Sequence, residues 1–277
     1  MDLLIEIFSE RFIQVGLAAS VILGGICAYL GVFLILKRIV FVGAALSQMA
    51  AVGVVIGHMI GHKIGLNFEA LAFLFSILGV LFFWLPVSGG SITRESIIGF
   101  SYIFASALAI LIIAKDPLAE VENLDLFSGN ILFVSDFDLL LISGISGIIF
   151  IVHMIFHKKF IFVSFDLTTA QTLKIPARFY DFLIYFTLGI AISVGIRSAG
   201  MLFIFSSLVI PAMTGLSLFQ RLRWIFLASV LSIWIASIIG IVVSYRFDFP
   251  TGPAISVTNA LILLICLFVK RFLLRST

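Results

Sequence analysis

The chain alternates between long apolar runs and short polar interruptions. Most runs are about 20 residues long, which is the length of a helix that crosses the ~30 Å hydrocarbon core of a bilayer. The strict alternation of polar and apolar residues that is typical of membrane β-barrel strands is missing. The pattern therefore predicts an all-α, polytopic transmembrane bundle, with almost the whole chain passing back and forth through the membrane.

Charged residues and Gly/Pro positions divide the chain into about nine predicted membrane segments. Their expected ranges are 12–36, 40–62, 66–87, 95–115, 138–157, 178–196, 199–217, 224–244 and 254–270. Only a couple of residues separate 178–196 from 199–217, so one helix of that pair, or of the pair within 12–62, is expected to be broken or re-entrant. Eight and nine spans fit equally well, within a single transmembrane domain that comprises residues 1–277.

The composition excludes a sizeable water-soluble domain. Hydrophobic residues make up 62% of the 277 positions and charged residues 11%, whereas soluble domains carry about 25% charged residues. The mean hydropathy is +1.28. Cys27 and Cys266 lie within apolar runs, where they are expected to be small buried residues without a disulfide. The acidic N-terminus lacks the basic start of a cleavable signal peptide.

The basic clusters between the runs predict an orientation in the membrane. They are Lys37-Arg38, Arg94, Lys158-Lys159, Lys174 with Arg178, Arg221 with Arg223, and Lys270-Arg271. Placing all of them in the cytoplasm puts the N-terminus outside and the C-terminus inside, with Lys63 and Arg197 as exceptions. The loop 116–138 then lies outside and is acidic. It could be merely solvated, or it could face a partner or gather cations.

Few polar side chains lie within the apolar segments, and these are the candidates for function because an unpaired polar group is costly there. Ser47 and Gln48 occur early in the second segment. They could hydrogen-bond to a neighbouring helix or line a pathway, and the sequence favours neither interpretation.

Two pairs of histidines have helical i, i+4 spacing. His58 and His62 would share one helix face near the predicted outer side, where they could bind a transition metal, although adjacent Lys63 weakens that interpretation. Anchoring of the helix end is the alternative. His153 and His157 repeat the spacing, but two lysines follow them and make a metal site less favourable.

Two proline-containing stretches indicate irregular structure. Pro211 removes a backbone donor from an apolar run that also contains Ser206 and Ser207, and these three residues are candidates for a broken helix or gate. The turn-rich stretch 244–253 predicts an external turn, in which Asp248 would cap the following helix.

The stretch 165–176 predicts a short helix on the cytoplasmic face. Asp166 is a suitable N-cap, an amphipathic segment follows, and Pro176 ends it. Such a helix between two spans would be a natural lever for an attached cytoplasmic protein.

The chain resembles the permeases of metal-type ABC transporters, the membrane subunits of bacterial zinc, manganese and iron importers. The likeness covers essentially the whole chain and lies in 31–38 running into 42–49, 95–99, 199–202 through 210–212, and 248–253, with 165–176 fitting the family's coupling helix. No single motif among them is highly specific, but together they follow the family's order.

The resemblance implies a transport subunit in the bacterial inner or plasma membrane. Two copies would enclose a pathway for a divalent metal ion, a cytoplasmic P-loop ATPase would drive alternating access, and an extracytoplasmic solute-binding protein would deliver the ion. ATP hydrolysis would occur on the partner, since this chain has no P-loop motif. No cofactor and no nucleic acid is expected. The implied coupling residues are Phe165, Asp166, Ala170, Leu173, Lys174 and Pro176.

One departure from the family concerns the cargo. Where the family typically has Gly-Asp-Ala-x-Ser-His-Ala, this chain has Ala44 in place of the acid and Gln48 in place of the histidine. Alanine has no donor atom and glutamine is a weak ligand. Either the ion passes without tight coordination, or His58 and His62 substitute, or the cargo is not a bare divalent cation. Lys174 replaces a frequent glycine.

Two other classes of protein fit the sequence less well. An ion- or proton-coupled carrier that works without an ATPase is the alternative, and the apparent lack of buried acids to accept a coupling proton disfavours it. An intramembrane enzyme is disfavoured because no nucleophile–base or metal constellation is present.

Overall fold

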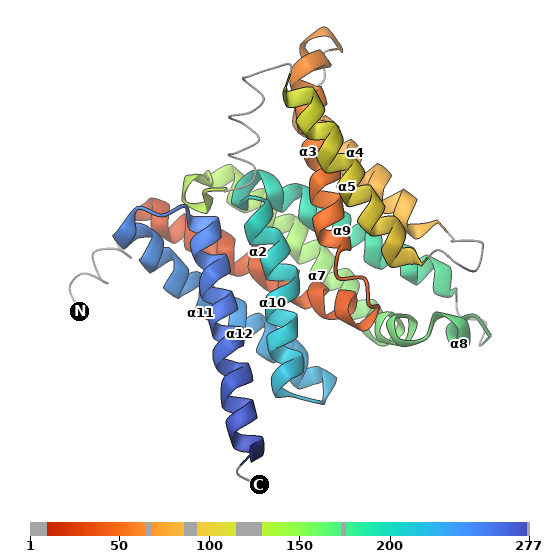
Figure 1. The fold of residues 1–277 in the computed structure, drawn as a ribbon, viewed down its shortest axis with the longest axis vertical. Coiled ribbons are helices and arrows are strands. Elements are labelled where there is room, and N and C mark those ends of the chain that lie inside the picture. Colours follow the sequence, from red (N-terminus) through yellow and green to blue (C-terminus); the bar gives the residue numbers. More distant parts are fainter. Residues whose placement is uncertain (1–9, 65–67, 86–92, 115–128, 173–175, 276–277) are drawn as a thin grey trace.

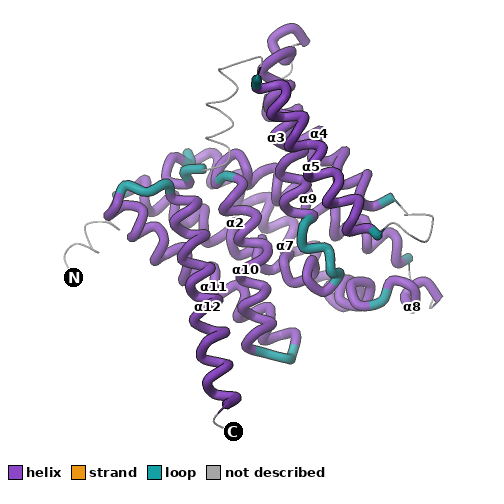
Figure 2. Tube along the Cα trace, in the orientation of Figure 1, coloured by secondary structure: helices purple, strands orange, loops and turns teal. Residues whose placement is uncertain are grey.

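The computed structural model describes residues 10–64, 68–85, 93–114, 129–172 and 176–275. Within these ranges, the side chains of 58–64, 68–69, 167–168, 171 and 272–275 are not described. The described residues form helices joined by short loops, and they contain no strand (Figure 2). The predicted all-α fold is confirmed.

The helices correspond closely to the apolar runs of the sequence. They are α2 (Arg11–Leu36), α3 (Val42–Ile64), α4 (Phe68–Trp84), α5 (Arg94–Ile113), the 3-10 helix η1 (Ile131–Phe133), α7 (Asp136–Phe165), α8 (Leu167–Thr172), α9 (Ala177–Ala199), α10 (Met201–Leu218), α11 (Leu222–Phe247) and α12 (Thr251–Arg275). Seven of the described helices are long and apolar enough to span a membrane, and α3 and α4 contain shorter apolar stretches. Each predicted segment is therefore a helix.

Helix α2 forms the centre of the bundle, in contact with α7, α9, α10 and α11. Its closest approach is to α10 at Gly31, where an added Cβ would lie 1.7 Å from the carbonyl oxygen of Leu208. Only a residue without a side chain permits this contact between two helix backbones. Small residues commonly have this function where helices pack in lipid.

Helices α3, α4 and α5 lie side by side and stand out from the rest of the bundle (Figure 1). Gly53 of α3 packs against the backbone of Leu71 and Ala72 on α4. Helix α4 in turn contacts α9, where Ser76 Oγ donates to the carbonyl of Gly189 at 3.5 Å. This group of helices is therefore attached to the bundle mainly through α9.

The joint between α9 and α10 is a single residue, Gly200, with φ 83°. This left-handed conformation favours glycine. In contrast, α10 runs without interruption through Pro211. The expected helix break at Ser206, Ser207 and Pro211 is therefore wrong: the interruption lies at Gly200, because one missing donor does not prevent the flanking residues from staying helical.

Two further local predictions need correction. Asp248 does not cap the helix that follows it; it ends α11 as a C-cap in the left-handed region, with φ 52°. Helix α7 extends beyond the predicted range 138–157, because helical hydrogen bonding continues past the point where apolar residues give way to charged ones. Ser135 and Asp138 form a capping box at its start.

Large apolar side chains are exposed on the outer helices. Examples are Ile103 on α5, Leu140 and Ile155 on α7, and Leu264 and Phe268 on α12. Exposure on this scale would be unfavourable in water. It is the surface expected of helices that contact lipid.

Candidate functional site

A buried ionic cluster joins the ends of three helices. The Lys37 ammonium, directly after α2, donates to the Asp181 carboxylate on α9. Arg94, the first residue of α5, lies 3.5 Å from the second carboxylate oxygen and 3.3 Å from the Tyr185 hydroxyl. The side chains of Lys37 and Asp181 are only 7% and 3% exposed, and that of Arg94 is 28% exposed. Asp181 thereby holds α2 and α5 against α9.

The cluster contains two cations for one carboxylate. Burial lowers the pKa of the Lys37 ammonium, and the neighbouring Asp181 opposes that shift. The sequence did not predict this site. The apparent lack of buried acids was an argument against an ion-coupled carrier, and the buried Asp181 shows that this premise was wrong. The available signal was a single acid within the apolar run 178–196.

The predicted short helix after α7 is confirmed as α8. Asp166 caps it: one carboxylate oxygen accepts from the Thr169 backbone N–H at 3.0 Å and the other from the Thr169 hydroxyl at 2.5 Å. Ala170 is fully buried, whereas Phe165 is exposed. Helix α8 contacts both α7 and α9, and α9 begins directly after Pro176. Leu173 and Lys174 lie outside the described residues.

The three predicted pathway residues differ in their surroundings. Ser47 Oγ donates to the Gly43 carbonyl of its own helix at 2.8 Å. Gln48 is buried, and its side-chain amide lies 3.9 Å from the thioether sulfur of Met201, the first residue of α10. Ala44 is half-buried. Gln48 is thus the member of this set that reaches another helix, and it meets a soft, weakly accepting sulfur.

His58 and His62 both lie within α3, but their side chains are outside the described part of the structure. Among the residues that are described, no group of three or more His, Cys, Asp or Glu side chains could hold a metal ion. The proposed metal contact of this pair is therefore untested.

The second histidine pair joins α7 to its neighbours. His153 is fully buried, and its Nε2 lies 2.9 Å from the Thr187 hydroxyl on α9. His157 Nδ1 lies 3.1 Å from the Tyr29 hydroxyl on α2. Both imidazoles therefore connect helices in the core.

The polar side chains of α10 divide between paired and unpaired groups. Ser206 Oγ lies 2.8 Å from Ser256 Oγ on α12, so it links these two helices. The buried Ser207 hydroxyl has no hydrogen-bond partner among the described residues. Pro211 is buried in the same helix. The structure brings these residues together on one helix without showing a gate.

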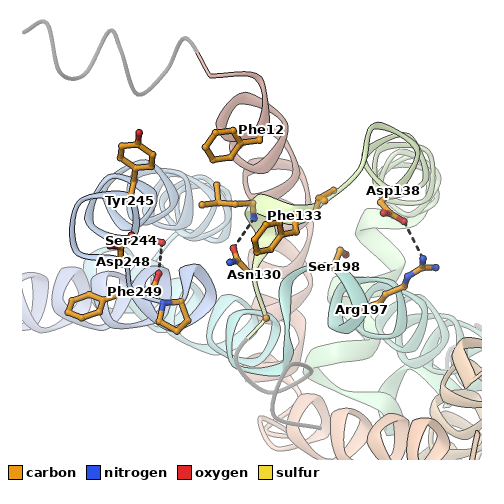
Figure 3. Close-up of a pocket in the computed structure, with 14 residues that line it drawn as sticks. Phe12, Asn130, Phe133, Asp138, Arg197, Ser198, Ser244, Tyr245, Asp248 and Phe249 are labelled. Atoms are coloured by element: carbon orange, nitrogen blue, oxygen red, sulfur yellow. Dashed lines mark hydrogen bonds and ion pairs between the residues drawn. The ribbon is translucent and has the colours of Figure 1, made fainter. Parts of the chain in front are cut away.

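A cavity of about 760 Å³ lies at the opposite end of the bundle from α8, which is the predicted outer side. Figure 3 shows Asp138 and Arg197 facing each other at one side of it, 3.8 Å apart, with Tyr245, Asp248 and Phe249 at the other. Between them, Asn130 precedes η1, and its side-chain oxygen accepts a hydrogen bond from the Thr251 hydroxyl at 3.0 Å.

Comparisons with known proteins agree with this architecture over nearly the whole chain. The sequence model of the ABC 3 transport family matches residues 9–270. A "probable iron transport system membrane protein" of Haemophilus influenzae is 29% identical over 266 residues, which cover 96% of this chain and 92% of the relative. The "manganese import system permease protein ScaB" of Streptococcus gordonii is 28% identical, with 96% and 95% covered.

A solved structure is also similar over its full length. It is that of "PsaBC from Streptococcus pneumoniae in complex with Fab", with a TM-score of 0.83 and 26% identity, covering 99% of each chain. The agreement in fold thus extends from α2 to α12.

Proposed function

Because the chain belongs to the ABC 3 transport family, we propose that it is the permease subunit of an ATP-driven importer of a divalent transition metal ion. It is a multi-pass bacterial membrane protein. The observation that supports the proposal best is the similarity over nearly the whole chain to relatives named for iron and manganese transport. The match to the ABC 3 transport family does not favour a carrier that works without an ATPase. The whole chain 1–277 would act as one permease domain.

In this proposal α8 receives the movement of a cytoplasmic ATPase. The six-residue helix is fixed at its start by Asp166 and is followed almost directly by α9. A displacement of α8 would therefore act on α9 and on the Asp181 carboxylate that α9 carries. Since helices are stiff elements, a lever of this kind can transmit a change between two discrete arrangements.

The Lys37–Asp181 ion pair would carry the movement on to the pathway. Lys37 precedes α3 by five residues, and α3 carries Ala44, Ser47 and Gln48 near its start. Arg94 connects the same carboxylate to α5, which packs against α3. Movement of α9 would thus reach α3 from two sides, and alternating access of the pathway would follow.

The outer cavity would receive the extracytoplasmic binding protein. Its rim combines aromatic side chains such as Phe133 and Tyr245 with the Asp138–Arg197 pair. Aromatic residues and arginine are enriched in protein interfaces. A second copy of the chain would complete the pathway.

The cargo would be coordinated weakly at the level of Gln48. The side chain offers an amide oxygen, and Met201 offers a thioether, whereas Mn²⁺ and Fe²⁺ are held more tightly by carboxylates and imidazoles. Weak coordination would favour fast release of the ion. His58 and His62 remain candidate ligands near the outer side.

Co-purification and uptake together test this function. The permease is expressed with its cognate ATPase and binding protein, and uptake of manganese, iron and zinc is measured. We expect ATPase to co-purify and at least one of the metals to be taken up. A permease that never associates with the ATPase would contradict the proposal. If a variant with both His58→Ala and His62→Ala transports as well as the unmodified protein, these histidines are not ligands.

A further inference from the structure

A second cavity, of about 350 Å³, opens next to the ionic cluster. It is lined by the joint between α2 and α3 (residues 37–39), the start of α5 (93–95), the end of α7 (163–165) and Tyr185. The cavity therefore lies where three membrane helices end, on the same side of the bundle as α8.

Basic side chains predominate in this cavity. Lys37, Arg38 and Arg94 are opposed by Asp181, which contacts two of them, and by Glu95 at the lining, leaving one positive charge in excess. The Arg38 guanidinium has no partner among the described residues, and Arg94 engages Asp181 and Tyr185 through a single nitrogen. Several N–H donors therefore remain for a ligand.

A buried hydroxyl adds a further unsatisfied group. Ser164 is one of the residues that line the cavity. It is only 5% exposed, and its buried Oγ has no hydrogen-bond partner in the described part of the chain. A buried polar group without a partner destabilises a fold by about 1–3 kcal/mol. An acceptor bound in the cavity would remove that penalty.

The N-terminus of α5 also offers hydrogen-bond donors to an anion in this cavity. Thr93 caps this helix, and its hydroxyl accepts from the Ser96 backbone N–H. The first backbone N–H groups of a helix have no partner within the helix, and its N-terminus attracts anions. Residues 93–95 are part of the cavity lining, so these donors lie beside Arg94 and Ser164.

We propose that this cavity binds a phosphate group. Phosphate oxygens accept several hydrogen bonds at once, and arginine is well suited to them. The excess of a single positive charge matches a phosphodiester monoanion, and basic pockets at the membrane boundary are typical sites for anionic lipid headgroups. The phosphate would come from such a lipid or from free phosphate in solution.

Ligand-induced thermal stabilisation of the purified, full-length permease in detergent distinguishes the two sources. The probes are short-chain phosphatidylglycerol, zwitterionic phosphatidylcholine and inorganic phosphate, each titrated separately. A ligand that binds the folded protein raises its melting temperature in a saturable manner. We expect phosphatidylglycerol or inorganic phosphate to do so, and phosphatidylcholine to have a much smaller effect.

Three variants locate the site. Arg38→Gln should weaken binding of the active probe roughly 10-fold, and Ser164→Ala roughly 2- to 10-fold. Ser164→Ala should leave the unliganded protein as stable as before or more stable, because it removes an unpaired hydroxyl. The control is Arg178→Gln, an exposed arginine of α9 that is not part of the cavity lining.

Each outcome is decisive. Saturable stabilisation by phosphatidylglycerol that Arg38→Gln and Ser164→Ala weaken, but Arg178→Gln does not, supports the site with a lipid as its source. The same pattern with inorganic phosphate supports it with a soluble source. If neither phosphatidylglycerol nor inorganic phosphate stabilises the protein, if phosphatidylcholine stabilises it equally well, or if Arg38→Gln and Ser164→Ala respond no differently from Arg178→Gln, the proposal is wrong.

Discussion

Lys37 and Asp181 are 144 positions apart in the sequence and form a buried ion pair between the end of α2 and α9. Arg94 contacts the same carboxylate from α5. The three helices therefore meet at one charged centre, close to α8 and directly before the helix that carries Gln48. The contact links the proposed lever to the proposed pathway.

Removal of the carboxylate should be strongly destabilising. Asp181→Asn leaves two cations in a buried site without their counterion, and loss of one partner from a buried pair costs about 3–5 kcal/mol. The melting temperature of the purified permease should fall accordingly. Asp136→Asn is the control, because it breaks the Arg11–Asp136 pair, whose side chains are 81% and 65% exposed. Exposed pairs contribute only about 0–1 kcal/mol.

A double substitution separates pairing from packing. Lys37→Met combined with Asp181→Leu removes the buried charges of both partners, and Arg94 is exposed enough to turn towards solvent. We expect this variant to recover much of the stability lost in Asp181→Asn. Equal stability of Asp181→Asn and Asp136→Asn would contradict the importance of the buried pair.

Gly31 should not tolerate a side chain. Gly31→Ala places a methyl group against the Leu208 backbone, so α2 and α10 must separate, and overpacking of this kind costs about 1–3 kcal/mol or more. Size-exclusion profiles and melting temperatures of the detergent-purified variant measure the effect. Gly144→Ala on α7 is the matched control: nothing lies within 4 Å of its added Cβ, so stability should stay the same or rise. Similar losses in both variants would contradict the close contact.

The helices could be predicted from the sequence, whereas their contacts could not. Apolar runs of about 20 residues are typical of membrane-spanning helices, and most of them became helices within a few residues of their expected ends, whereas α7 continues to Phe165. The capping of α8 was also predictable, because Asp166 and Thr169 are local in sequence. The role of Asp181 was not predictable, because it depends on which helix ends lie beside α9.

Two local errors have a common physical origin. Pro211 was expected to break its helix, but only one backbone hydrogen bond is lost and the surrounding packing keeps α10 continuous. The interruption lies at Gly200, and Asp248 ends α11 in the left-handed region where glycine is more usual. Propensity identified the residue types that suit turns, but tertiary packing decided where each turn occurs.

Asp166 should matter for coupling more than for folding. Asp166→Ala removes the two bonds to Thr169 and should destabilise α8 by about 1 kcal/mol. We expect ATP-driven uptake to fall several-fold while the melting temperature of the membrane bundle changes little. Asp166→Ser keeps a capping side chain and should retain most of the uptake. If Asp166→Ala transports normally, α8 does not act as the lever.

An acid at position 44 and a histidine at position 48 should change the kinetics of metal uptake. Ala44→Asp together with Gln48→His introduces a carboxylate and an imidazole one helical turn apart on α3. We expect a lower KM for Zn²⁺ or Mn²⁺ uptake, accompanied by slower maximal uptake because the ion is released less readily. Ala45→Ser, at a buried neighbouring position, serves as the control. Unchanged kinetics in the double variant would show that these positions do not face the ion.

The most direct measurement is metal uptake in proteoliposomes that contain the permease with its ATPase and its binding protein. Radiolabelled manganese or iron is supplied outside and ATP inside, and the same vesicles are prepared without ATP and with the permease alone. The account predicts uptake only when the three components and ATP are present together. Uptake by the permease alone, driven by an ion gradient in the absence of ATP, would contradict it.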